Sequence, residues 1–384
     1  MGAFLIAFQT AFTLAIVINA TFIISMRIEK MTRPTGMDVE NIIALNSQGY
    51  KEDFNKEIVT QEDLRLLRSL PGVIDASPTQ SIPLSGSGWS SEFTPKLDDE
   101  TNKTSIANYY VDDHMINTLG IKLESGRNFL PEEISFYDMD NNQTDSVVII
   151  TEAAALKLYP DGNALGNPVY NTNGSVAIIV GIIEHMHGAW VGWEGLDRVM
   201  LIPKYMHSRY LVRVTPGSLN GLLPIIEEKL LAGSPDRLIR KVKPLSEYLE
   251  HSYAMDRAMS IVLGVVVFLL IVVAGLGIIS LATFNVNRRI KQIGTRRALG
   301  ATRSDILNYF LLENWIITTI GIVLGSMLGI TFNYWLISSF ELPRLDWYFV
   351  LGGILTVWVL GLLSVYTPAR SASMVSPAIA TRNL

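Results

Sequence analysis

The sequence predicts a membrane protein with four transmembrane α-helices and a large α+β, two-lobed extracytoplasmic domain inserted between helices 1 and 2. Three observations lead to this fold class. Hydrophobic residues make up 49% of the 384 residues and charged residues only 17%, below the roughly 25% of a soluble domain. The uncharged residues gather into four long runs. One polar stretch, 27–257, separates the first run from the other three.

The four uncharged runs are each long enough to cross a membrane. They contain 26, 30, 27 and 23 residues and lie at 1–26, 258–287, 314–340 and 347–369. A helix needs about 20 apolar residues to cross the hydrocarbon core. A helix is also the only single segment that satisfies its own backbone hydrogen bonds there. We therefore expect a transmembrane helix at each of the four positions.

A cleaved signal peptide is the alternative for 1–26. Signal peptides carry basic residues before the apolar core and small residues at the cleavage site. No Lys or Arg precedes this run, and Asn19-Ala20-Thr21 continues into the apolar Phe22-Ile23-Ile24. A membrane helix is therefore the favoured interpretation.

The basic residues predict the orientation. The segment 288–313 holds six Lys or Arg and two acidic residues, and 370–384 holds two Arg and no acid. Short cytoplasmic loops are enriched in Lys and Arg, so we expect a cytoplasmic coupling loop at 288–313, a cytoplasmic tail at 370–384 and a cytoplasmic N-terminus. The stretch 27–257 then lies outside. Three basic residues at its start run against the rule, namely Arg27, Lys30 and Arg33; long domains translocate largely regardless of such charges.

The stretch 27–257 has the composition of a folded soluble domain. It carries 22 basic and 32 acidic residues, a net charge of −10, whereas the rest of the chain carries +5. Two strand–helix–strand patterns lie at its ends. They comprise strands at 41–45 and 73–74 around a helix at 61–70, and strands at 210–214 and 238–242 around a helix at 219–232. Two such units predict a split, ferredoxin-like lobe formed by about 27–80 and 200–245, with Thr60 and Asp63 as the capping signal of the first helix.

The residues between these patterns, about 80–200, are expected to form a second lobe inserted into the first. Its apolar runs predict strands at 146–150 and 176–183 and a short helix at 152–158, with loops at 85–91 and 138–145. Beyond the second pattern, apolar residues recur at near-helical spacing at Leu245, Leu249, Tyr253 and Met259. We therefore expect a stalk helix at 245–257 that runs directly into the second membrane helix.

The sequence lacks the residues that several classes of protein need. There is no cysteine, which excludes disulfides and cysteine nucleophiles, and the net charge of −5 argues against a nucleic-acid partner. No phosphate-binding G-x-x-x-x-G-K-[ST] motif occurs, so we expect a non-catalytic chain without a cofactor of its own. His185 and His187, beside Glu184, share a face after a predicted strand. Without a further clustered His they are interpreted as loop-end histidines, and no metal site is predicted.

The segment 288–304, R-R-I-K-Q-I-G-T-R-R-A-L-G-A-T-R-S, is the most informative. Its apolar residues can line one side of a surface helix, with Gly300 ending it and Ser304 capping the next helix. The alternative is an ordinary basic loop whose arginines reach lipid headgroups. Gly294 and the small residues at 298–301 suit the close approach of a protein partner instead. The residues assigned to partner docking are Arg288, Arg289, Gln292, Ile293, Gly294, Arg296, Arg297, Leu299 and Gly300.

Glycines in the membrane helices predict close helix packing. Gly321, Gly325 and Gly329 recur every fourth residue and share one face, the pattern that lets helices touch backbone to backbone. Gly275 and Gly277 add a small surface on the second membrane helix. The pattern fits packing within the chain and dimerisation equally well. At the start of the third membrane helix, Glu313 is expected to snorkel or to pair with an arginine of the preceding loop.

These segments resemble the MacB/FtsX-like permeases of ABC transporters, a group proposed to transmit mechanical motion. Residues 275–278 followed by 287–301 look like the family's membrane span and its R-x-x-E-I-G-I-R-R-A-L-G-A loop. Further similar segments lie at 120–129, 164–166, 179–182, 305–313 and 368–377. Gln292 stands where the family usually has Glu, so any salt bridge from that position is lost.

The resemblance implies a dimeric permease of the bacterial inner membrane. A separate ABC ATPase subunit, holding ATP and Mg, would dock on 288–301 and move the external domain. The second permease would be another copy or a paralogue, and a periplasmic membrane-fusion protein with an outer-membrane channel are further implied partners, besides the lipid bilayer.

Three functions fit this resemblance. The leading hypothesis is export of peptides, antibiotics or lipid-linked substrates. The alternatives are an FtsX-like regulatory subunit that controls an envelope enzyme and a lipoprotein-releasing permease. The size of the external domain disfavours the regulatory subunit. The sequence identifies neither the substrate nor the choice between homodimer and heterodimer.

Overall fold

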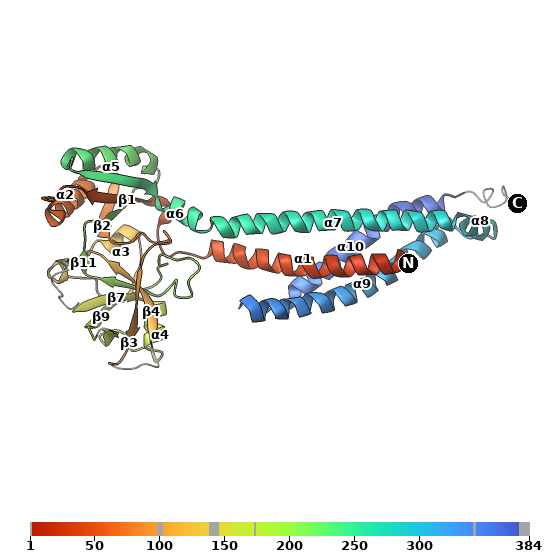
Figure 1. The fold of residues 1–384 in the computed structure, drawn as a ribbon, viewed down its shortest axis with the longest axis horizontal. Coiled ribbons are helices and arrows are strands. Elements are labelled where there is room, and N and C mark those ends of the chain that lie inside the picture. The colour runs from red at the N-terminus through yellow and green to blue at the C-terminus, as the bar shows by residue number, and fades with distance from the viewer. Residues whose placement is uncertain (1, 98–102, 138–145, 173, 341–342, 376–384) are drawn as a thin grey trace. The chain divides into compact units, whose positions relative to one another are not determined.

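The computed structural model describes residues 2–97, 103–137, 146–172, 174–340 and 343–375. The loop expected at 138–145 and residues 376–384 of the expected tail lie outside these ranges. The chain divides into two compact units. One, the membrane unit, comprises Met1–Thr32 and Met255–Leu384, and the other, the inserted domain, comprises Arg33–Ala254. The predicted fold class, four membrane helices and an α+β domain between the first two, is confirmed (Figure 1).

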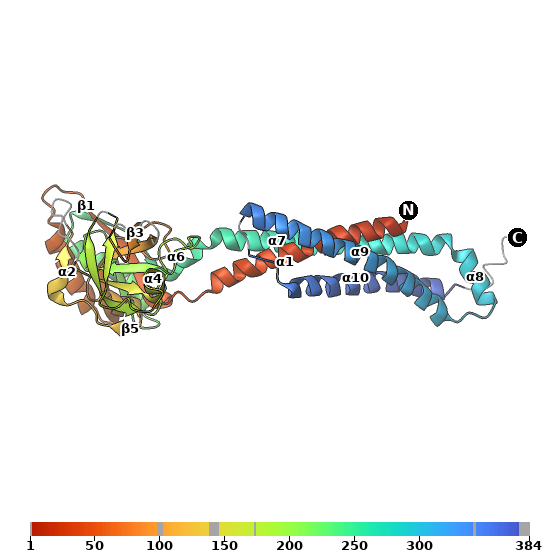
Figure 2. The ribbon, with the colours of Figure 1, turned by 90° about the horizontal axis from the view of Figure 1, so that it is seen from below.

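Four helices of the membrane unit are long and apolar enough to cross a membrane. They are α1 (Gly2–Thr32), α7 (Ala254–Arg288), α9 (Arg303–Phe340) and α10 (Trp347–Ser373), and a short helix, α8 (Ile290–Ala298), lies between α7 and α9. Helix α9 packs along α1 and α10, and both views show these helices side by side (Figures 1 and 2). Helix α7 is the least buried of the four, with 17% of its apolar window inside the structure.

The helix predicted from Leu245 into the second membrane helix is interrupted. Helix α6 (Leu245–Ser252) ends at Tyr253, where ψ is 8°, and α7 begins at Ala254. Leu245 is fully buried in the core of the inserted domain, and Tyr253 is also buried. The spacing of apolar residues is the same for one helix and for two short ones, so the sequence pattern could not reveal this break.

The two ends of the inserted domain form the ferredoxin-like lobe. Its strands are β1 (Ile42–Gly49), β2 (Val73–Thr79), β12 (Arg209–Val214) and β13 (Arg237–Pro244), in the antiparallel order β13-β1-β12-β2. Helices α2 (Lys56–Ser69) and α5 (Leu219–Gly233) bury Leu67, Ile226 and Leu230 against this sheet. The order is that of two split βαβ units. A one-turn 3₁₀ helix, η1 (Val39–Asn41), precedes β1.

The first helix of this lobe begins earlier than predicted. Asn55 caps α2 by accepting a hydrogen bond from the backbone N–H of Ile58 at 3.0 Å. Thr60, predicted as the cap, lies inside the helix, and its hydroxyl bonds the carbonyl of Lys56 and the ring of His207. The charged first turn of α2 hid its start, because Lys56 and Glu57 carry no apolar periodicity.

Residues 80–205 contain the β-rich lobe, a seven-stranded sheet in the order β5-β9-β7-β10-β4-β3-β8. Its strands are β3 (Trp89–Thr94), β4 (Thr104–Tyr110), β5 (Leu123–Gly126), β7 (Val147–Thr151), β8 (Pro168–Asn171), β9 (Val176–Ile183) and β10 (Val199–Ile202). The remaining elements are α3 (Met115–Leu119), η2 (Pro131–Glu133), α4 (Glu152–Leu158) and the pair β6 (Ser135–Phe136) and β11 (Lys204–Tyr205). Part of the loop expected at 85–91 is therefore strand, since β3 begins at Trp89.

Candidate functional site

The first candidate site is the turn formed by α8 and its junctions. Helix α8 ends at Ala298, and Gly300 follows with a φ of 101°, a left-handed conformation that favours glycine. The N–H of Gly300 bonds the carbonyl of Arg297, and the N–H of Ala301 bonds that of Arg296. These bonds satisfy the last carbonyls of α8 and turn the chain sharply toward α9.

Helix α9 begins at Arg303, ten residues before the end of the expected loop at 288–313. Thr302, not the predicted Ser304, caps it. The Thr302 hydroxyl accepts from the N–H of Asp305 at 3.2 Å, and the Asp305 carboxylate accepts from the N–H of Thr302 at 2.9 Å. Because of this reciprocal capping box, α9 begins before the uncharged run 314–340 from which the helix was predicted.

One face of α8 is fixed to the membrane unit. Ile293 and Gly294 are buried, and Ile293 packs in a cluster with Ile306 and Phe310 of α9 and Ala372 of α10. This apolar contact holds α8 against two long helices at once.

Two arginines reinforce that attachment. Arg289 donates to both carboxylate oxygens of Glu313, at 2.7 and 3.1 Å, and to the hydroxyl of Tyr309 at 3.3 Å. Arg297 donates to the carbonyls of Ser373 and Val375 at 2.7 and 3.1 Å. Each arginine makes these bonds through a single guanidinium nitrogen, Nη1, and its positive charge strengthens them. Both arginines, selected as docking residues, therefore contact α9 and the end of α10 within the chain.

The opposite face of α8 is exposed. Gln292, Arg296 and Leu299 follow one another at helical spacing and are all exposed, with Leu299 at 84%. Arg288, also exposed, precedes them by one turn, and exposed Gly300 ends the surface. The guanidinium of Arg296 lies 4.8 Å from the ring centroid of Tyr309, a cation–π contact that orients it. We call Arg288, Gln292, Arg296 and Leu299 the α8 stripe.

The glycines of α9 face α1. A Cβ built on Gly321 would lie 2.8 Å from the carbonyl oxygen of Ala7, and one built on Gly325 would lie 2.7 Å from that of Ala11. Gly329 is less tight, with the Ala15 Cα at 3.3 Å. The absence of side chains here lets the two backbones approach closely. Asn19 of α1 adds a hydrogen bond from its Nδ2 to the Gly329 carbonyl at 3.0 Å.

The glycines of α7 contact two other helices. A Cβ on Gly277 would lie 2.6 Å from the Gln9 amide of α1, and one on Gly275 would lie 3.4 Å from Leu360 and Ser364 of α10. The Gln9 amide also donates to the Val273 carbonyl at 3.2 Å. All five selected glycines therefore lie at contacts between helices of the membrane unit.

Two of the three basic residues that run against the orientation rule, Arg27 and Lys30, lie beside an acidic residue. Arg27 hydrogen-bonds Asp256 of α7, and the Lys30 amine lies 3.5 Å from the same carboxylate. Asp256 is buried, so it offsets positive charge at this end of α1. Periodicity along the chain could not predict this pairing, because Asp256 lies more than 220 positions from Arg27 and Lys30.

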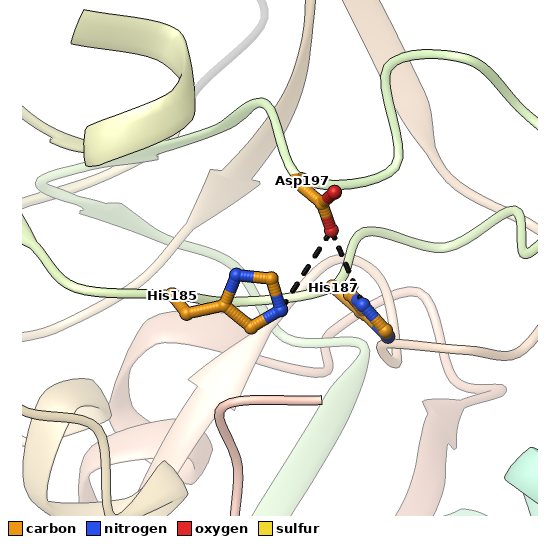
Figure 3. A group of neighbouring side chains, drawn as sticks. All are labelled: His185, His187 and Asp197. Atoms are coloured by element: carbon orange, nitrogen blue, oxygen red, sulfur yellow. Dashed lines mark ion pairs between the residues drawn. The ribbon is translucent and has the colours of Figure 1, made fainter. Parts of the chain in front are cut away.

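In the inserted domain, His185 and His187 lie beside Asp197, which the sequence analysis did not select (Figure 3). The three offer ligand atoms within 4.8 Å of one another and are the one such group in the described ranges. The imidazole of His187 holds the pKa of Asp197 below its ordinary value, so the carboxylate is ionised at neutral pH.

Family models match segments of both the membrane unit and the inserted domain. The model of the MacB-like periplasmic core domain matches residues 5–221, and the model of the FtsX-like permease C-terminal domain matches residues 264–377. Two solved domains are similar at low scores. The periplasmic region of MacB from Actinobacillus actinomycetemcomitans has a TM-score of 0.36 and 15% identity, covering 56% of this chain and 94% of that one. The extracellular domain of YknZ from Gram-positive bacteria has a TM-score of 0.33 and 15% identity, covering 52% of this chain and 97% of that one.

Full-length relatives are similar in sequence. The macrolide export ATP-binding/permease protein MacB of Wolinella succinogenes is 24% identical over 358 residues, 87% of this chain and 50% of that protein. A probable export ATP-binding/permease protein of Pseudomonas fluorescens is 26% identical over 70% of this chain and 42% of its own. The uncharacterized ABC transporter permease YknZ of Bacillus subtilis is 23% identical over 84% of this chain and 79% of its own length. The chain spans about half the length of the ATP-binding/permease relatives. Since one family model covers more than half of this chain, the protein belongs to the MacB/FtsX-like family of ABC transporter permeases.

Proposed function

We propose that this chain is the permease subunit that converts ATP hydrolysis by a nucleotide-binding partner into movement of its inserted domain. The observation that carries the proposal is the division of α8 into two faces. Ile293, Arg289 and Arg297 fasten one face to α9 and α10, while the α8 stripe is exposed. A partner that binds the stripe would therefore displace the long helices together with α8.

The chemistry of the stripe suits a protein partner. An apolar side chain exposed at 84% and close to an arginine suits a protein interface, where Arg is among the residues that carry most of the binding free energy. Gln292, uncharged where the family usually has Glu, lets the partner approach without an acidic group between the two arginines.

The expected substrates are peptides, antibiotics or lipid-linked molecules taken from the outer side of the membrane. The inserted domain would be periplasmic, with both termini and α8 in the cytoplasm. An FtsX-like regulatory output and lipoprotein release use the same coupling. Transport into proteoliposomes, activation of an envelope hydrolase and release of a lipoprotein from the bilayer are the three assays that separate them.

The test is reconstitution of this permease with a separate ABC ATPase subunit. Arg296→Glu with Leu299→Asp changes two exposed side chains and removes one internal contact, that of Arg296 with the Tyr309 ring. We expect normal assembly of the membrane unit, loss of most ATPase co-purification, and loss of permease-dependent ATPase stimulation. Arg370→Glu, an exposed charge reversal on α10, is the matched control and should behave like wild type. Retention of both complex formation and stimulation in the double variant would sink the assignment of α8 as the docking element.

A further inference from the structure

The group of His185, His187 and Asp197 has the arrangement of a metal site. His185 and His187 follow β9, and Asp197 precedes β10 (Figure 3). The Nε2 atom of His187 lies 3.1 Å from Oδ1 of Asp197, and Nε2 of His185 lies 3.7 Å from the same oxygen. Figure 3 shows both ring nitrogens directed at that oxygen. Three ligand atoms from the two ends of the loop 184–198 therefore converge on one point.

Two of the three separations are close to those of tetrahedral coordination. Zn²⁺ binds imidazole nitrogen and carboxylate oxygen at about 2.0–2.2 Å, so neighbouring ligand atoms lie about 3.3–3.5 Å apart. The two measured separations lie on either side of this value, and the third is no longer than 4.8 Å. Small rotations of the side chains suffice to seat an ion.

The backbone holds the two ends of the loop 184–198 in place before any ion binds. The N–H of Gly188, next to His187, bonds the carbonyl of Leu196, next to Asp197, at 2.7 Å. The carbonyl of Asp197 accepts from the Thr151 hydroxyl at 2.6 Å. Because the residues beside the ligands are fixed by these bonds, little ordering free energy is lost when a cation arrives.

The different burial of the three side chains favours an ion that faces solvent on one side. The His187 side chain is 1% exposed, whereas those of His185 and Asp197 are 32% and 42% exposed. Oδ1 of Asp197 is itself inaccessible to solvent and makes no conventional hydrogen bond among the described residues. An inaccessible anionic oxygen directed at two imidazoles points to a cation, and the exposed side leaves room for water or a substrate group as fourth ligand.

We propose that His185, His187 and Asp197 bind a divalent transition-metal ion, zinc in preference to magnesium or calcium. Two imidazoles and one carboxylate suit zinc, nickel and copper, whereas magnesium and calcium take oxygen ligands almost alone. Arg33 lies close enough to influence the Asp197 carboxylate, and its positive charge weakens cation binding without removing a ligand.

The site also touches the segment that follows α1 in the chain. Nε2 of His185 lies 2.9 Å from the carbonyl oxygen of Pro34, and the N–H of His187 bonds the carbonyl of Thr35 at 3.1 Å. A metal ion takes the Nε2 lone pair of His185, so the hydrogen bond to Pro34 must be released or replaced by coordination of that carbonyl. Metal binding therefore changes how the segment 33–36 is held on the β-rich lobe.

The experiment measures Zn²⁺ binding to the full-length chain in detergent, purified with a tag that contains no histidine. Competition with a chromophoric chelator should give one ion per chain for wild type. His185→Gln and Asp197→Asn keep side-chain size and should each weaken binding at least tenfold. His251→Gln, an exposed histidine on α6, is the matched control and should bind like wild type. Substitution by Co²⁺ should give the intense visible absorption of tetrahedral coordination in wild type and not in the two ligand variants.

Stability distinguishes loss of a ligand from loss of the fold. All three variants should keep the far-UV circular dichroism and the unfolding temperature of metal-free wild type, and Zn²⁺ should raise that temperature only for wild type and His251→Gln. Equal Zn²⁺ affinity in wild type, His185→Gln and Asp197→Asn would refute the proposal, and so would the absence of one-to-one binding in wild type. In both cases the three side chains form only a hydrogen-bonded ion pair. Neither result bears on the α8 stripe.

Discussion

Gly325→Ala should loosen the contact between α1 and α9. A Cβ at this position would lie 2.7 Å from the carbonyl oxygen of Ala11, 2.9 Å from its Cα and 3.1 Å from the Cβ of Leu14. Carbon atoms prefer separations of about 3.5–4.0 Å. The helices must therefore move apart by about 0.7 Å along this line, because the atoms that are met first belong to the α1 backbone and cannot rotate away.

The size of the effect follows from two opposing contributions. Overpacking of this kind costs about 1–3 kcal/mol, and a radial gap of about 0.5–1 Å forfeits a quarter to a half of each contact's dispersion energy. Against this, Ala stabilises a helix interior by about 1 kcal/mol relative to Gly. We expect a net loss of up to about 2 kcal/mol in the free energy of unfolding.

The assay is unfolding in mixed micelles with increasing SDS mole fraction, followed by circular dichroism. Gly352→Ala on α10 is the control, because no atom lies within 4 Å of its built Cβ, so the helix-propensity gain should act alone. Gly329→Ala, with its nearest atom at 3.3 Å, should fall between the two. If Gly325→Ala and Gly352→Ala shift the midpoint equally, the backbone contact read from these distances is wrong.

Two further predictions concern topology and pH. Because the chain has no cysteine, Ser87→Cys in the inserted domain should react with an impermeant maleimide in intact spheroplasts, and Thr295→Cys on α8 only after permeabilisation; the reverse pattern would overturn the proposed orientation. Burial lowers the pKa of His207 to about 4, so the folded state favours the neutral ring. Stability should be full above the unfolded pKa of about 6.5 and fall toward pH 4, by at most about 3 kcal/mol. Urea unfolding should show this loss reduced in His207→Gln, and an unchanged loss would contradict it.

The membrane helices were predictable because lipid imposes one strict requirement, the absence of unpaired charge, over about 20 residues. The ferredoxin-like lobe was predictable because its strands and helices alternate with clear periodicity. Helix α4 likewise spans the predicted 152–158. These features depend on residues that are close together in the sequence, so one amino-acid sequence is enough to predict them.

The contacts of the candidate sites depend on neighbours in space. Arg289, Arg296 and Arg297 look alike in the sequence, yet Arg289 and Arg297 hydrogen-bond within the chain, whereas Arg296 is exposed and stacks on the ring of Tyr309. Asp197 follows His187 by ten residues, a spacing that predicts no contact. The Gly188–Leu196 backbone bond brings the two ends of the loop 184–198 together. The caps Asn55 and Thr302 were missed because charged first turns masked the start of each helix.

The two connections between the membrane unit and the inserted domain contact the inserted domain at different places. The segment after α1 lies against the loop of His185 in the β-rich lobe, where Gly36 leaves no space for a Cβ beside the His185 carbonyl. Helix α6, which precedes α7, packs on η1, β1 and β13 of the ferredoxin-like lobe, and its Ser252 hydroxyl donates to the carbonyl of Leu84 in the β-rich lobe. Within the membrane unit, Asp256 pairs α7 with Arg27 and Lys30 of α1. The Asp256 ion pairs therefore hold α1 and α7 to one another at the residues where the chain passes between each helix and the inserted domain.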